Sequence, residues 1–263
     1  MTTTDLTPDL RAAVRDLILV LADSKRLLGM RYAGWILGAP ELEAGIACAS
    51  MAQDEWGHAR LLYSLLKDFD DDVDALEHGR ESADYRSMEA LDAAPATWAD
   101  LVALNALADT ALTVQFEALR QSGYPPLRQR VEKLLEEERF HEAHAAAWFR
   151  RLANGGPAAR QAIHDAVRAM VPSILEWFGP DSRRARGLVS ASVADATGST
   201  LRARFIERLV PVLRAIDAAE AFANIEPEFD GFDEGRRRSR GEGPDAATIE
   251  QVRGDRNRAF LLD

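Results

Sequence analysis

The sequence predicts an all-α protein built around a four-helix bundle that carries a metal centre. Two observations support this: long stretches with apolar residues three and four positions apart, and two copies of a Glu-x-x-His motif, at Glu55–His58 and Glu138–His141. Residues i and i+3 share a helix face, so each motif can aim a carboxylate and an imidazole at one point. Carboxylate-bridged di-metal bundles use two such motifs, with one further carboxylate from each of two other helices.

A Glu-x-x-His pair can also lie on a solvated helix face without binding anything. Here the pair occurs twice, and both copies lie in apolar helical contexts, MAQDEWGHARLLYSLL and VEKLLEEERFHEAHAAAWF. A buried carboxylate and imidazole need a charge partner to offset their desolvation. The pattern therefore favours metal ligands over surface residues.

The first two helices are predicted to form an antiparallel hairpin. Helix one is indicated by an apolar stripe from Leu10 to Tyr32. The segment Gly38-Ala39-Pro40 interrupts this pattern, and a second helix from Glu41 to about Lys67 carries the first motif. The short connection between them favours antiparallel neighbours.

Residues 68–97 are acidic and poorly periodic, which predicts a long excursion with one short helix. A third helix is expected from about Trp98 to Gln121, and a fourth from about Leu127 to Ala153, which carries the second motif. The letters GYPP separate these two helices, and Asn154-Gly155-Gly156 ends the fourth.

Two additional helices are predicted C-terminal to the bundle, near Ala158–Phe178 and Thr200–Phe222. We therefore expect a helical domain over residues 1–222. Residues 223–263 are predicted to be a mobile, charge- and glycine-rich linker followed by a short helix near Ala246–Arg258. The run Arg236-Arg237-Arg238 is expected to be solvated.

Composition limits the function classes. The chain has 263 residues, 47% of them hydrophobic, and a net charge of −11, which disfavours a nucleic-acid-binding surface. The one cysteine, Cys48, excludes an intramolecular disulfide and a thiolate cluster, and we expect it in the core. A metal site must then use oxygen and nitrogen ligands, which suits iron or manganese.

We expect a cytoplasmic protein without membrane association. The N-terminal letters MTTTDLTPDL do not have the basic and apolar regions of a signal peptide, and no uncharged run approaches membrane-spanning length.

The third helix offers a further carboxylate for the metal site. Two Fe(II) ions carry four positive charges, which four carboxylates with two neutral imidazoles would balance. Glu55 and Glu138 supply two of these carboxylates. Asp109, isolated in LNALADTALTVQFEAL, is the best candidate for a third, and Glu117 is the runner-up. His144 is either a supporting donor or a packing residue, and the packing role is favoured.

Helix one is the difficulty for a complete di-metal ligand set. It contains no glutamate, and its plausible ligand, Asp23, is followed by Ser24 and then by the cations Lys25 and Arg26. We expect either that Asp23 supplies the missing ligand or that the ligand set is incomplete.

The stretches APELEAGIACASMAQDEWGHARLLYSLL, LEEERFHEAH and ILEWFGPDS resemble the ferritin-like subunits of bacterial phenylacetyl-CoA epoxidase, over about Leu10 to Ala219. The chain is most similar to the catalytic subunit, with similarity to the related structural subunit that has lost its metal ligands. The resemblance implies a ferritin-like bundle and, as metal ligands, Glu55, His58, Asp109, Glu138 and His141. It supports Asp109 over Glu117.

The resemblance also implies a function. The catalytic subunit of that family holds a di-iron centre, activates O2 with electrons from a separate reductase, and epoxidises the aromatic ring of a CoA thioester in phenylacetate catabolism. For this chain it implies oxygenation of an aromatic CoA thioester or a related small molecule, and a homologous ferritin-like subunit or a second copy as a partner. The alternative is a catalytically inactive interaction subunit of a multicomponent oxygenase.

The chain departs from the family in helix one, where the family's glutamate aligns with Arg26, which cannot ligate a metal. Three outcomes are compatible with this change. Asp23 can complete a di-iron site while Arg26 points outward, a single metal can bind with Arg26 as the second cation, or the site can be vestigial. Retention of five of the six ligands argues against full decay.

Overall fold

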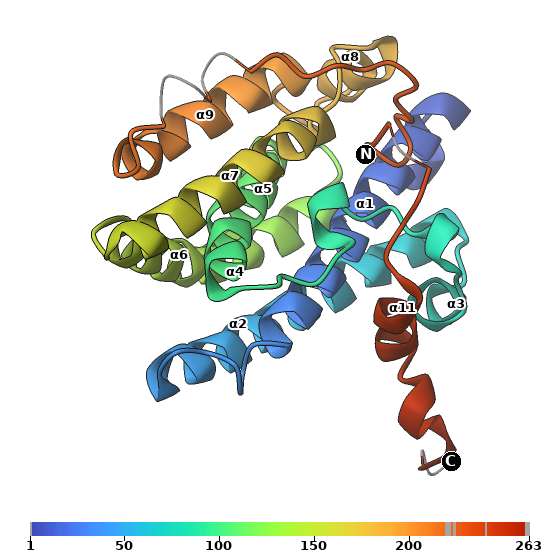
Figure 1. Cartoon of the computed structure of the whole chain (residues 1–263). Helices are drawn as coiled ribbons and strands as arrows, with labels where there is room; N and C mark the ends of the chain where they lie inside the picture. Colours follow the sequence, from blue (N-terminus) through green and yellow to red (C-terminus); the bar gives the residue numbers. More distant parts are fainter. Residues whose placement is uncertain (1, 219–221, 223–224, 240, 261–263) are drawn as a thin grey trace.

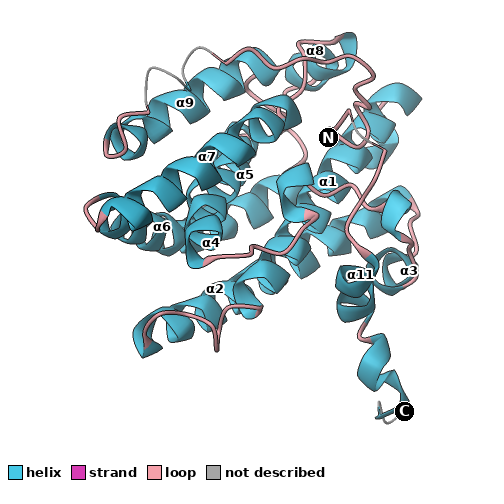
Figure 2. Ribbon diagram, in the orientation of Figure 1, coloured by secondary structure: helices cyan, strands magenta, loops and turns pink. Residues whose placement is uncertain are grey.

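The computed structural model describes residues 2–218, 222, 225–239 and 241–260, and within these ranges every regular element is helical. Figures 1 and 2 show the long helices packed side by side, with shorter ones at both ends of the bundle. The predicted all-α, ferritin-like bundle with additional C-terminal helices is confirmed.

The four predicted bundle helices are present with similar bounds. They are α1 (Pro8–Ala33), α2 (Leu42–Leu65), the continuous run of α4 (Trp98–Leu104), a π-helical turn (Asn105–Asp109) and α5 (Thr110–Leu119), and α6 (Pro125–Ala153). Local signals fix their beginnings. Thr7 caps α1 ahead of a proline at its first position, and the Thr97 side chain caps α4 by accepting a hydrogen bond from the Asp100 amide.

The excursion between α2 and α4 contains the one short α-helix expected of it, α3 (Val73–His78), together with 3-10 turns. Beyond the bundle lie α7 (Pro157–Trp177), α8 (Arg183–Ser190), α9 (Gly198–Arg214) and α11 (Ala246–Arg253). Helix α8, which is short and capped by Ser182, was not predicted from the sequence. Helix α9 ends earlier than predicted, and part of the predicted extension to Phe222 lies outside the described residues.

Helices α1 and α2 approach each other closely at Gly29. A Cβ atom at Gly29 would lie 2.7 Å from the Trp56 indole and 3.1 Å from the Glu55 Cβ. Because only hydrogen fits in this space, the glycine lets the motif-bearing turn of α2 press against α1. Helix α1 is therefore buried around most of its circumference, and Cys48 on α2 lies in the core as predicted.

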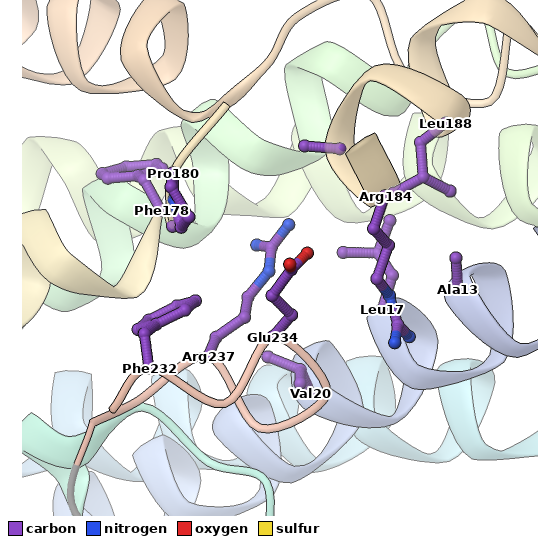
Figure 3. A pocket seen from close by; sticks show the side chains of 12 residues that line it. Ala13, Leu17, Val20, Phe178, Pro180, Arg184, Leu188, Phe232, Glu234 and Arg237 are labelled. Atoms are coloured by element: carbon purple, nitrogen blue, oxygen red, sulfur yellow. The ribbon is translucent and has the colours of Figure 1, made fainter. Parts of the chain in front are cut away.

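The C-terminal segment is docked on the bundle. Arg238 is 2% exposed and binds the Asp92 carboxylate, while Arg236 donates to the Tyr85 carbonyl. Figure 3 shows Phe232 and Arg237 beside residues of α1 around a small cavity of about 40 Å³. The expectation of a solvated arginine run is wrong, because these guanidinium groups find acceptors on the acidic excursion and on α5. The boundary at residue 222 stays a prediction.

No helix among the described residues is both long and apolar enough to cross a bilayer.

Candidate metal centre

Side chains from both motifs and from the third bundle helix converge in the core. Ligand atoms of Glu55, Asp109, Glu138 and His141 all lie within 4.8 Å of one another, and His58 Nδ1 lies 3.2 Å from Glu138 Oε1. All five side chains are at most 3% exposed. The five residues predicted to form the site therefore meet at one point, and their role as metal ligands stays a prediction.

A sixth member of the cluster, Lys25 of α1, was not predicted. Its Nζ donates hydrogen bonds to Glu55 Oε1 at 2.9 Å, Asp109 Oδ1 at 2.8 Å and Glu138 Oε1 at 2.6 Å, and its side chain is fully buried. Burial lowers the pKa of Lys25, but the three carboxylates outweigh it and hold the pKa well above its ordinary value. The residue is a permanent cation in the centre.

Two expectations for helix one are wrong. Arg26 does not face the centre, because its guanidinium binds Glu77 and the Val252 carbonyl. Asp23 also lies outside the cluster: its carboxylate accepts hydrogen bonds from Arg80, the Tyr63 hydroxyl and the Arg86 amide. Successive helix positions are about 100° apart, so a one-residue difference decides which cation enters the core.

The π-helical turn positions Asp109 and its neighbours. Asp109 Oδ2 accepts hydrogen bonds from the Tyr32 hydroxyl at 3.0 Å and from Asn105 Nδ2 at 3.3 Å. His144 Nδ1 lies 3.1 Å from Asn105 Oδ1, so His144 belongs to this supporting network and is not a ligand. Glu117, the runner-up carboxylate, is paired with Arg208 away from the cluster.

The two motif histidines are strongly perturbed by the surrounding carboxylates. Burial lowers the pKa of His141, but the charge and hydrogen bond of Asp109 outweigh it and raise the pKa to about 12. Burial acts in the same direction on His58, and Glu138 and Glu55 raise its pKa to about 9. Without a metal, both imidazoles are therefore protonated at neutral pH and balance part of the carboxylate charge.

The outward ring nitrogens of the same histidines contact two acids that were not predicted from the sequence. His58 Nε2 lies 2.7 Å from Glu137 Oε2, and His141 Nε2 lies 3.3 Å from Asp54 Oδ2. A signal was present in the sequence, since each motif glutamate is directly preceded by an acid.

Most of the chain matches one protein family. The family model for phenylacetic acid catabolic proteins covers residues 1–220. The chain belongs to this family. The resemblance seen in the sequence is thereby confirmed, and the fold is the ferritin-like helical fold of the phenylacetic acid catabolic proteins.

Two curated members of this family come from Escherichia coli (strain K12), and both are subunits of 1,2-phenylacetyl-CoA epoxidase. The chain is 30% identical to one of them over 194 residues, which cover 70% of this chain and 61% of that relative. It is 27% identical to the other over 163 residues, which cover 61% of this chain and 66% of that relative. The chain thus spans slightly less than two thirds of each relative.

The residues of this family member fit one divalent cation. Glu55 Oε2 and His58 Nδ1 are buried without a hydrogen-bond partner, although the desolvation of such atoms normally requires one. Lys25 takes one oxygen from each of three carboxylates and leaves the second oxygen of each for another cation. The cluster therefore retains the carboxylate and imidazole donors that iron or manganese prefers.

Proposed function

We propose that this protein is a ferritin-like subunit of a multicomponent oxygenase and that it binds one divalent metal ion beside Lys25. The observation that carries this proposal is the Lys25 ammonium, which lies 2.6–2.9 Å from three carboxylates. An ammonium at this place supplies a positive charge that a second metal ion would otherwise supply. Of the three outcomes left open by the sequence, the contacts support a single metal, with Lys25 in the role expected of Arg26.

Charge balance supports the same conclusion. Glu55, Asp109 and Glu138 carry three negative charges when ionised, and Lys25 carries one positive charge. With neutral imidazoles, one divalent ion makes the centre neutral, whereas two leave it with an excess of two positive charges. Unit charges about 4 Å apart interact by roughly 4 kcal/mol at an effective dielectric constant of 20, so this excess is unfavourable in a closed core.

The metal would be held by Glu55, Asp109, Glu138 and His141, with His58 at the edge of the cluster. A bound iron ion would supply one-electron redox chemistry and Lewis acidity toward O2. The chain itself fixes the donors: Lys25 holds three carboxylates, and the Tyr32 hydroxyl holds the second oxygen of Asp109.

For the reaction, we propose O2-dependent oxygenation, such as epoxidation, of an aromatic CoA thioester in the degradation of phenylacetate or a related aromatic compound. The support is the similarity to two subunits named for phenylacetyl-CoA epoxidation. A reductase that supplies electrons, and a homologous ferritin-like subunit or a second copy of this chain, are the proposed partners.

One observation favours a second candidate, a catalytically inactive structural subunit of such a complex. The ammonium of Lys25 has three N–H donors, and each has a carboxylate acceptor. The centre is thus largely charge-compensated without a metal, as a scaffold would require.

Metal content separates these possibilities. Protein produced with iron and then reconstituted with Fe(II) without oxygen should contain about one iron ion per chain by elemental analysis. Lys25→Glu should raise this content toward two, because it restores a carboxylate from helix one. Arg26→Glu is the matched control and should leave it unchanged, since Arg26 points away. No metal in the wild-type protein would support the scaffold, and two ions would contradict the role given to Lys25.

A further inference from the structure

The outward side of the centre carries a crosswise pair of contacts between α2 and α6. Asp54, in the first motif region, contacts His141 of the second motif. Glu137, in the second motif region, contacts His58 of the first motif. Each acid directly precedes its own motif's glutamate, so the two regions share the pattern acid-Glu-x-x-His and exchange their acids across the helix pair.

We propose that Asp54 and Glu137 are positioning residues that orient the imidazole of the opposite motif toward the metal. This inference rests on the proposed metal site for its purpose, but its geometry is independent of any metal. A carboxylate beside Nε2 accepts the Nε2 proton and leaves Nδ1 as the inward nitrogen. In both histidines Nδ1 does face the cluster, 3.0 Å from Asp109 Oδ2 for His141 and 3.2 Å from Glu138 Oε1 for His58.

The burial pattern supports this division of roles. The side chains of Asp54 and Glu137 are 34% and 33% exposed, whereas the inward-facing carboxylates are at most 3% exposed. The two outer acids therefore lie between the closed centre and solvent and keep their own hydration. Lys133 pairs with Glu137 at 3.2 Å and helps to hold it in place.

A purely structural role would be different in kind, because the acids would then only stabilise the packing of α2 on α6. Double-mutant cycles on metal-free protein distinguish the two roles. Using Asp54→Asn, Glu137→Gln and His→Gln variants, the crosswise pairs Asp54–His141 and Glu137–His58 should be non-additive. In each of these pairs the second substitution should shift the urea midpoint by less than half of its shift alone.

The pairs within one motif, Asp54–His58 and Glu137–His141, should be additive in the same measurement. Coupling of these pairs in place of the crosswise pairs would overturn the proposal. Because no metal is present, this result does not depend on the proposed function.

A second measurement uses Co2+ as the probe of the full-length protein, followed by its visible absorption. Asp54→Asn and Glu137→Gln should each weaken Co2+ binding about 10- to 100-fold, the usual effect of removing a residue that orients a histidine ligand. Glu136→Gln is the matched control, a neighbouring acid on α6, and should bind Co2+ as the wild type does. Equal effects of all three substitutions would overturn the positioning role. Failure of the wild-type protein to bind Co2+ would overturn the metal proposal, and the cycles would still decide the crosswise pairing.

Discussion

At the scale of single residues, Lys25 places a fully buried charge among three carboxylates. Replacing Lys25 with methionine leaves those carboxylates without their cation. We expect Lys25→Met to lower the free energy of unfolding of metal-free protein by about 3–5 kcal/mol, the usual cost of removing one partner from a buried ion pair. Urea denaturation with and without Mn2+ measures this, and Mn2+ should restore more stability to the variant than to the wild type.

Arg26→Met is the control for this prediction. Its guanidinium and the Glu77 carboxylate are 15% and 19% exposed, so solvent screens their interaction. We expect a loss of at most about 1 kcal/mol and no added response to Mn2+. Equal losses for the two variants would mean that Lys25 is not the essential cation of the centre.

His58 gives the metal-free protein a pH dependence with a definite sign. Burial lowers its pKa, but Glu138 and Glu55 raise it from 6.5 to about 9. Between these values the folded protein binds more protons than the unfolded chain, so His58 stabilises fully below pH 6.5 and loses this effect as the pH rises through about 9. Urea unfolding should show a loss of up to about 3 kcal/mol across this interval.

The corresponding control is His58→Gln, in which this part of the slope should disappear. A wild-type protein whose stability rises between pH 6.5 and 9, relative to the variant, would contradict the protonated state assigned to His58.

At the scale of helices, the approach of α1 to α2 depends on Gly29. Gly29→Ala would place a methyl group 2.7 Å from the Trp56 indole, and we expect a loss of about 1–3 kcal/mol from overpacking. Gly57→Ala is the matched control, since a Cβ atom there meets nothing within 4 Å. It should stabilise α2 by about 0.5–1 kcal/mol. Thermal unfolding of both variants measures the difference, and two changes of the same sign would contradict the close approach.

The π-helical turn at Asn105–Asp109 is a second feature at this scale. A π turn inserts one residue relative to an α-helix and changes the direction of the side chains that follow. Here it places Asn105 and Asp109 in one hydrogen-bonded network. The letters LNALADT are typical of an ordinary buried helix, so this local change was not predictable from them.

At the scale of the whole molecule, the C-terminal segment is docked through Arg238. This guanidinium binds the Asp92 carboxylate with both terminal nitrogens, 2.8 and 3.0 Å away. Arg238→Ala would leave the largely buried Asp92 without this partner, and we expect the segment to open more often. Native-state trypsin cleavage within residues 225–239 should be at least about tenfold faster, because cleavage follows the population of the open form.

Arg120→Ala is the control for the docked segment, since Arg120 is exposed on the bundle. It should not change the cleavage rate. Rapid cleavage of the wild-type protein after Arg236–Arg238 would instead support the mobile linker that the sequence predicted.

The sequence by itself determined the helices and the residues that meet in the centre. Apolar periodicity and the breaking segments predicted the four bundle helices, and the i, i+3 spacing placed Glu55 with His58 and Glu138 with His141 on common faces. These features depend on neighbours along the chain, so they can be derived from spacing alone. The metal itself remains a prediction.

Only the tertiary structure decided which cation enters the centre and which acids support it. Helix α1 is buried around most of its surface, so its pattern does not single out one inward face, and packing against α2 turns Lys25 inward and Arg26 outward. The exchange of Asp54 and Glu137 between motifs likewise depends on how α2 lies against α6. Such contacts join residues far apart in the chain, and their geometry follows from the packed core.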